Sequence, residues 1–203
     1  MDPQFWRDRW QEGRIAFHEG RPNALLSRFA SRLEGRKRVL VPLCGKSDDL
    51  AYLASRGHEV VGIELVEDAV RAFFAEHGLA PEIDGTRYSA AGITLFARDV
   101  FDVTSAELGA IDAVYDRAAL VALPPELRVK YVAHLRAIAG AVPGLLVAID
   151  YPQELLPGPP FSVPDAEVRT HFASVELLAE DKLQGGRVAE LGVAVERIYA
   201  VTL

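Results

Sequence analysis

From residue 38 onward, short apolar runs rich in β-branched residues alternate with longer stretches of helical period. This alternation is typical of parallel strands joined by crossover helices, because parallel neighbours need a connection long enough to cross the sheet. The predicted strands cover residues 38–43, 59–65, 93–98, 111–115 and 144–150. The helices predicted between and after them cover residues 48–56, 67–77, 124–139 and 164–173. We therefore expect a doubly wound α/β fold.

The pattern changes after residue 173. Two strand-like runs, 174–183 and 194–203, flank the turn signal Gly185-Gly186, which predicts an antiparallel hairpin in place of another crossover. Five parallel strands followed by such a hairpin resemble the sheet of class I methyltransferases. We therefore expect a mostly parallel, seven-stranded, Rossmann-like sheet.

The segment ahead of the sheet, residues 1–35, is unusually aromatic and contains both tryptophans of the chain. Trp6 and Trp10 are four residues apart, a spacing that places them on one helical face. That face can pack on the core, or it can cover a ligand as a lid that excludes water and attracts a cation to its π faces. No linker or repeat divides the chain, so we expect one domain over 1–203, with a lid at 1–35 and the sheet at 36–203.

Composition excludes several classes of partner. A net charge of -7 argues against binding to a nucleic-acid backbone. The longest nearly apolar stretch, 137–149, is too short to span a membrane, and the charged N-terminus does not match a secretory signal. The scattered histidines lack metal-ligand spacing, and the single cysteine favours a reducing compartment. We expect a cytoplasmic monomer that holds no metal and acts on a small molecule.

The first predicted strand runs into a tight turn that opens a helix, with the sequence Pro42-Leu43-Cys44-Gly45-Lys46-Ser47. In a doubly wound sheet, ligands bind at the carboxyl ends of the strands, beside this turn. The turn does not match a P-loop, which needs glycine where position 40 is leucine, and it lacks the three glycines of a dinucleotide fingerprint. A ligand without a pyrophosphate is therefore favoured. Cys44 is expected to be a buried turn residue and not a nucleophile.

Acidic residues end the next two parallel strands. Glu64 can accept hydrogen bonds from both hydroxyls of a ribose, although a solvated helix cap is an equal alternative for this residue alone. Asp99 can accept from an adenine amino group while the amide of Val100 donates to the ring, although a turn cap is again an alternative. Together with Gly45, these residues predict a nucleoside pocket.

Asp116 and Arg117, an adjacent acid and base, directly follow the fourth predicted strand, where a substrate would lie. A structural ion pair between them is one interpretation. Arg117 is also the best candidate for contacting an anionic or polarisable acceptor, since its guanidinium stays charged and offers five donors.

Four segments together resemble the thiopurine S-methyltransferase family in its bacterial form: FW...RWQEGRIAFHEG, VLVPLCGKSDDLAYLASRGHEVVGIEL, AVYDRAALVALPPELR and DYPQE...GPPFSV. The resemblance covers nearly the whole chain. It implies that S-adenosylmethionine, and its product S-adenosylhomocysteine, are bound by Trp10, Leu43, Glu64, Asp99 with Val100, and Arg117. It also implies that Phe17 flanks the acceptor pocket. Some members of the family have a small polar residue in place of Asp99, so the adenine contact there would run through the backbone.

The implied reaction is methyl transfer to the sulfur of a thiopurine-like or other aromatic thiol. Such an in-line displacement needs alignment and exclusion of water, and a partly ionised sulfur needs little help from a base, so we assign no general base. Three alternatives stay open: a methyltransferase for selenium or tellurium oxyanions or small thiols, a nicotinamide-dependent oxidoreductase, and a noncatalytic binding module.

Overall fold

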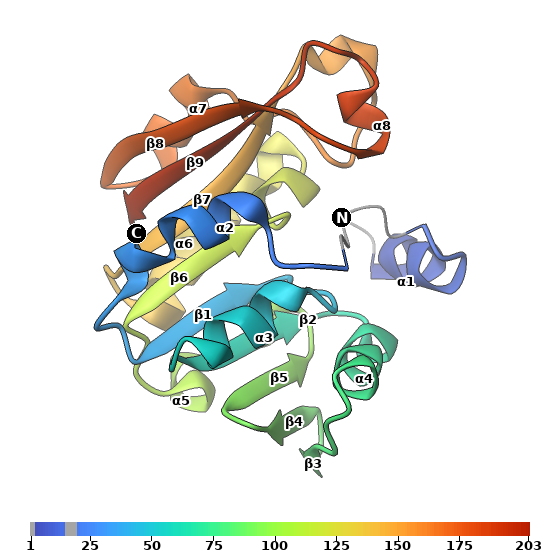
Figure 1. Cartoon of the computed structure of the whole chain (residues 1–203), viewed down its shortest axis with the longest axis vertical. Helices are drawn as coiled ribbons and strands as arrows, with labels where there is room; N and C mark the ends of the chain where they lie inside the picture. Colours follow the sequence, from blue (N-terminus) through green and yellow to red (C-terminus); the bar gives the residue numbers. More distant parts are fainter. Residues whose placement is uncertain (1–2, 15–19) are drawn as a thin grey trace.

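A computed structural model describes residues 3–14 and 20–203. Within them, nine strands form one mixed sheet in the order β3-β4-β5-β2-β1-β6-β7-β9-β8 (Figure 1). The strands are β1 (Arg38–Pro42), β2 (Glu59–Glu64), β3 (Glu82–Asp84), β4 (Arg87–Ala90), β5 (Ile93–Ala97), β6 (Ala113–Arg117), β7 (Pro143–Asp150), β8 (Ser174–Lys182) and β9 (Val195–Thr202). The α-helices are α1 (Pro3–Gln11), α2 (Ala24–Phe29), α3 (Asp48–Ser55), α4 (Glu67–Glu76), α5 (Ser105–Leu108), α6 (Pro125–Ala139), α7 (Asp165–His171) and α8 (Gly186–Ala189). Short 3-10 turns occur at η1 (Ala30–Leu33), η2 (Val100–Asp102), η3 (Leu120–Ala122) and η4 (Gln153–Leu155).

The five predicted parallel strands are confirmed as β1, β2, β5, β6 and β7, which pair in parallel along the sheet. The fourth lies two residues later than predicted, at Ala113–Arg117 in place of 111–115. Before it, Asp112 is bonded to the backbone of Arg38 by its carboxylate and by its own amide. This shift makes Arg117 the last residue of β6 instead of a loop residue.

The prediction of seven strands was too low, because β3 and β4 form an additional hairpin at the edge of the sheet beside β5. All three residues of β3 are exposed. A strand without a buried face carries no apolar alternation, so sequence periodicity could not reveal it.

The C-terminal pair β8 and β9 is antiparallel, as predicted, and β9 also pairs antiparallel with β7. The connection between them is longer than the expected turn at Gly185-Gly186, because α8 begins there. Val188 of α8 packs with Leu183, Ala194 and Tyr151 in a small separate cluster. The connection thus reaches the carboxyl edge of the sheet, where Tyr151 follows β7.

Helices cover both faces of the sheet, which confirms the doubly wound fold (Figure 1). One core cluster joins α2, α3 and α4 to side chains such as Val39 and Val41 of β1. The other joins α5, α6 and α7 to the opposite face, where Leu40 points. Both faces of the central strands are buried, which explains their continuous apolar runs. None of the helices in the described ranges is long and apolar enough to cross a membrane.

The N-terminal segment divides into two parts with different packing. Trp6 and Trp10 lie on one helix, α1, as their spacing predicts, and α1 stands apart from the sheet beyond the arrowheads of β2 and β6 (Figure 1). In contrast, Leu26 of α2 and Leu33 of η1 are buried in the core. Within the predicted lid segment 1–35, α2 and η1 thus contribute side chains to the core. A lid stays a prediction for the residues before Asn23.

Candidate active site

The turn after β1 is held tightly against β2. The amide of Cys44 donates to the carbonyl of Ile63 at 3.0 Å, and Ser47 caps α3 by accepting from the amide of Asp49. A Cβ at Gly62 would lie 2.7 Å from the Cys44 sulfur and 2.5 Å from a methyl carbon of Leu95, so any other residue here would force these side chains to shift. Burial raises the pKa of the Cys44 thiol well above its usual range. This thiol is structural, as predicted, and not an activated nucleophile.

Glu64 is the buried acid that joins the ends of β1 and β2. One carboxylate oxygen accepts from the amide of Gly45 at 2.9 Å, and the other accepts from the amide of Val66 at 2.8 Å. Burial raises the pKa of Glu64, and the backbone donors act against that rise. A carboxylate offers about four lone-pair sites. The amide of Leu65 also acts on this carboxylate. Glu64 therefore keeps acceptor capacity for a further hydroxyl donor, which is compatible with a ribose.

Asp99 follows β5, the neighbour of β2, and lies half-buried at the same edge as Glu64. Its side chain accepts from the amide of Phe101 at 3.0 Å and so caps η2. Val100 is buried in the core. The alternative of a turn cap is thus observed, while an adenine contact by Asp99 or Val100 stays a prediction.

Arg117 and Asp116 do not form the ion pair considered from the sequence, since neighbouring residues of a strand point to opposite faces. Asp116 is buried and accepts from the hydroxyl of Tyr131 at 2.7 Å and from the amide of Leu120 at 3.1 Å. Arg117 is half-buried, and its charge instead opposes the burial that raises the pKa of Asp49. The charge of Arg117 therefore stabilises the carboxylate of Asp49 on α3.

Asp49 is the centre of a buried network that sequence reasoning missed. Its carboxylate accepts from the amide of Asn23 at 2.7 Å and from the hydroxyl of Tyr115 at 3.0 Å. It thereby links the start of α2, the first turn of α3 and strand β6. The helix dipole favours an acid anywhere in the first turn of a helix, and both Asp48 and Asp49 lie in the first turn of α3, so nothing in the sequence distinguished them.

Two of the three non-glycine residues with positive φ in the described ranges lie at the point where the strand order reverses; the third, Ala91, is in the turn between β4 and β5. From β1 the chain proceeds to β2 and β5 on one side of the sheet, and then to β6 and β7 on the other. Leu43 and Ala118, which directly follow the adjacent strands β1 and β6, have φ of 47° and 62°. Non-glycine residues in this region cost about 1 to 3 kcal/mol each and cluster at functional sites. The switch point is also where ligands of doubly wound sheets bind.

The α1 helix approaches the same edge. Trp6 and Trp10 are half-buried, and the guanidinium of Arg9 lies 5.9 Å from the centre of the Trp6 ring. Burial lowers the pKa of Arg9, and the charges of Arg14 and of Arg187 on α8 lower it further. The predicted acceptor residue Phe17 lies outside the described residues.

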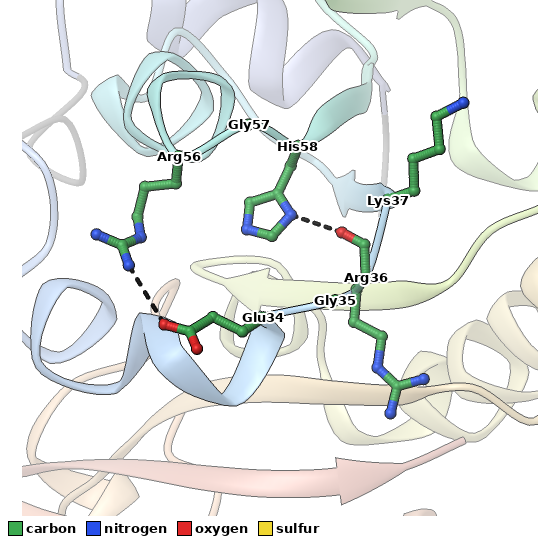
Figure 2. A pocket seen from close by; sticks show the side chains of 7 residues that line it. All are labelled: Glu34, Gly35, Arg36, Lys37, Arg56, Gly57 and His58. Carbon is green, nitrogen blue, oxygen red and sulfur yellow. Dashed lines mark hydrogen bonds and ion pairs between the residues drawn. The ribbon is translucent and has the colours of Figure 1, made fainter.

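A separate pocket of about 250 Å³ is lined by residues 34–37 and 56–58 (Figure 2). These residues precede β1 and β2, so the pocket lies at the amino edge, opposite the predicted site. Its side chains diverge: Arg56 pairs with Glu34 at 3.6 Å, while Nδ1 of His58 lies 2.6 Å from the carbonyl of Arg36 (Figure 2). Nothing here converges on a common ligand position, so we do not assign the cofactor to this pocket.

Asp116 is expected to make the stability of the protein depend on pH. Burial raises its pKa from 3.8 to about 6. Because the folded state binds the proton of Asp116 more tightly than the unfolded state does, protonation of Asp116 stabilises the fold. This contribution to the free energy of unfolding is fully present below about pH 4 and is lost as pH rises through about 6. Asp116→Asn should remove this dependence, shifting the wild-type-minus-variant difference in unfolding free energy by about 2 to 3 kcal/mol between pH 4 and 7. Urea unfolding across this range tests it, with exposed Asp102→Asn as control; parallel wild-type and Asp116→Asn profiles would contradict the prediction.

A doubly wound sheet with a last antiparallel strand, and a ribose-compatible acid without a dinucleotide fingerprint, define a class I S-adenosylmethionine-dependent methyltransferase. Solved methyltransferases share this fold. The chain aligns with the 1,6-didemethyltoxoflavin N1-methyltransferase of Burkholderia thailandensis at a TM-score of 0.64, with 16% identity over 98% of this chain and 86% of that one. It aligns with the magnesium protoporphyrin IX methyltransferase of Synechocystis at 0.63, with 16% identity over 100% and 99%. Both were solved with S-adenosylhomocysteine bound.

Sequence comparison identifies the family within this class. The family model for thiopurine S-methyltransferase matches residues 1–199. A thiopurine S-methyltransferase of Pseudomonas paraeruginosa is 53% identical over 181 residues, which cover 86% of this chain and 83% of that protein. One of Pseudomonas fluorescens is 44% identical over 214 aligned positions, covering 99% of both chains. The chain therefore belongs to the thiopurine S-methyltransferase family and is an S-adenosylmethionine-dependent methyltransferase.

Proposed function

We propose that this methyltransferase transfers a methyl group to the sulfur of thiopurine-like or other aromatic and heterocyclic thiols. The observation that carries the proposal is Arg117, a half-buried cation at the end of β6, directly before the strained residue Ala118. A guanidinium at this position can stabilise a thiolate. The names of the curated relatives agree with such an acceptor.

The cofactor would be held on the other side of the switch point. Glu64 would accept from the ribose hydroxyls, the turn of Leu43 and Gly45 would line the sulfonium end, and Asp99 with Val100 would border the adenine. When bound, S-adenosylmethionine supplies an electrophilic methyl group. Trp10 would cover it and exclude water, and Arg117 would orient the acceptor sulfur for in-line attack. We assign no general base, because an ionised thiol has no proton to lose.

The proposal extends to the setting in which the protein works. We propose one domain over 1–203 with a lid limited to the residues before Asn23, acting in the cytoplasm as a monomer without nucleic-acid partners. The single cysteine, Cys44, is free and buried, which is compatible with a reducing compartment. Sedimentation at several concentrations tests the monomer.

The deciding experiment is methyl transfer from labelled S-adenosylmethionine to a panel of thiopurines, aromatic thiols, aliphatic thiols, selenite and tellurite. We expect the largest kcat/KM with aromatic and heterocyclic thiols. A preference for the metalloid oxyanions, or for small aliphatic thiols, would reject the proposed acceptor class and favour the corresponding alternative.

Arg117→Lys should lower kcat/KM for ionised thiols by about 10- to 100-fold, since lysine keeps the charge but loses the directed donors. The melting temperature should change little, because a cation still faces Asp49. Steady-state kinetics and thermal unfolding measure both effects. The matched control is Arg32→Lys, which alters a surface pair with Glu176. A lower melting temperature with unchanged kcat/KM would assign Arg117 to the scaffold.

A further inference from the structure

Arg128, in the first turn of α6, is a completely buried arginine with 0% exposure. Its Nε donates to the carbonyl of Leu123 at 2.9 Å, and Nη2 donates to the carbonyl of Ser162 at 3.0 Å. Nη1 donates to both carboxylate oxygens of Glu167 on α7, at 2.7 and 2.8 Å. One planar group thus binds three chain segments in three fixed directions.

Two of these segments are the loops that leave the carboxyl edge beside Arg117. Residues 118–123 follow β6, and residues 151–163 follow β7, its parallel neighbour. The loops also meet directly, because the amide of Phe161 donates to the carbonyl of Val121 at 2.6 Å. Leu123 and Ser162, which Arg128 holds, lie near the far ends of the two loops. The guanidinium therefore fastens the β6 loop to the β7 loop.

Ser162 passes this restraint on to the residues that leave β7. Its hydroxyl accepts from the amide of Tyr151 at 3.0 Å and donates to the carboxylate of Asp150 at 3.1 Å. The hydroxyl of Tyr151 in turn donates to the carbonyl of Pro160 at 2.6 Å. A displacement of Ser162 would therefore also displace Tyr151 and the part of the loop around Pro160.

Stability alone does not explain such an arrangement, since replacing a buried ion pair by apolar side chains is often neutral or stabilising. The residues assigned to the cofactor follow β1, β2 and β5, whereas both loops follow β6 and β7. We infer that Arg128 is a positioning residue for the acceptor half of the active site, which shapes the acceptor pocket by locking the 118–123 and 151–163 loops together. This inference rests on the proposed function, which places the acceptor at Arg117.

The test compares Arg128→Lys with wild type in the full chain. Lysine keeps the charge but cannot serve three directions with a planar fork. We expect kcat/KM for the preferred thiol to fall at least tenfold, while the Kd for S-adenosylhomocysteine stays within twofold by calorimetry. Amide hydrogen exchange should accelerate in both loops. Ile138→Ala, a core substitution at the other end of α6, is the control for destabilisation. It should change neither the amide hydrogen exchange of the two loops nor kcat/KM for the thiol.

A second variant covers the case in which Arg128→Lys does not fold. Glu167→Gln keeps both hydrogen bonds from Arg128 to the loop carbonyls. We therefore expect a smaller fall in kcat/KM and a smaller acceleration of amide exchange in the two loops. Unaltered exchange in the two loops, or equal losses with Ile138→Ala, would overturn the inference. A weaker Kd for S-adenosylhomocysteine with unchanged acceptor kinetics would also overturn it. A further outcome is that the wild-type protein methylates no thiol while amide exchange in the two loops accelerates only in the Arg128 and Glu167 variants. In that case the proposed acceptor class fails, but the role of Arg128 in holding the two loops together is retained.

Discussion

Glu64→Ala is expected to weaken binding of S-adenosylhomocysteine by about 10- to 150-fold. Hydrogen bonds to a charged group contribute roughly 1.5 to 3 kcal/mol, and each 1.4 kcal/mol is about tenfold in Kd. The carboxylate would lose its contacts to the ribose hydroxyls and release the amides of Gly45 and Val66, which it now holds. Titration calorimetry on the folded variant measures the loss.

The control for this substitution is Glu59→Ala at the opposite end of the same strand, where the side chain pairs with Arg38 and Lys37 near the amino edge. It should leave Kd unchanged. Glu64→Gln adds a variant of equal size, which we expect to fall between wild type and Glu64→Ala. A lower melting temperature with normal affinity in Glu64→Ala would show that Glu64 only holds the turns at Gly45 and Val66 together.

Deleting residues 1–17 should leave a folded protein whose kcat falls on the order of a hundredfold, the cost of losing alignment and water exclusion around the reacting atoms. The structural reason is that α1 stands apart from the sheet, whereas the core begins with α2 (Figure 1). Circular dichroism, thermal unfolding and methyl-transfer kinetics on the truncated chain check both parts of the prediction.

Leu26→Ala provides the opposite case. This side chain is fully buried in the core, so its truncation should cost about 2 to 5 kcal/mol of stability while turnover per folded molecule stays normal. If deletion of residues 1–17 lowers the stability of the protein as much as Leu26→Ala does, the aromatic helix packs as part of the core and the lid proposal fails.

Much of the fold could be predicted because the parallel strands are buried on both faces. Burial on both sides demands an unbroken apolar run, as in β1 and β2, and such runs stand out in a sequence. Gly45, Glu64 and Asp99 could be placed at one edge for a related reason: the carboxyl ends of parallel strands lie together. The edge strand β3 and the helix α8 escaped prediction because short elements with little burial leave no periodic signal.

The sequence by itself determined the order of strands and helices, the carboxyl edge as the place for a ligand, and the acid available there. Only the tertiary structure decided which charges meet. The charge of Arg117 acts on Asp49, while its neighbour Asp116 accepts from Tyr131. Arg128 reaches Glu167, which is 39 residues away along the chain. The physical reason is that periodicity reports whether a side chain is buried, whereas its partner depends on how distant helices pack across the faces of the sheet.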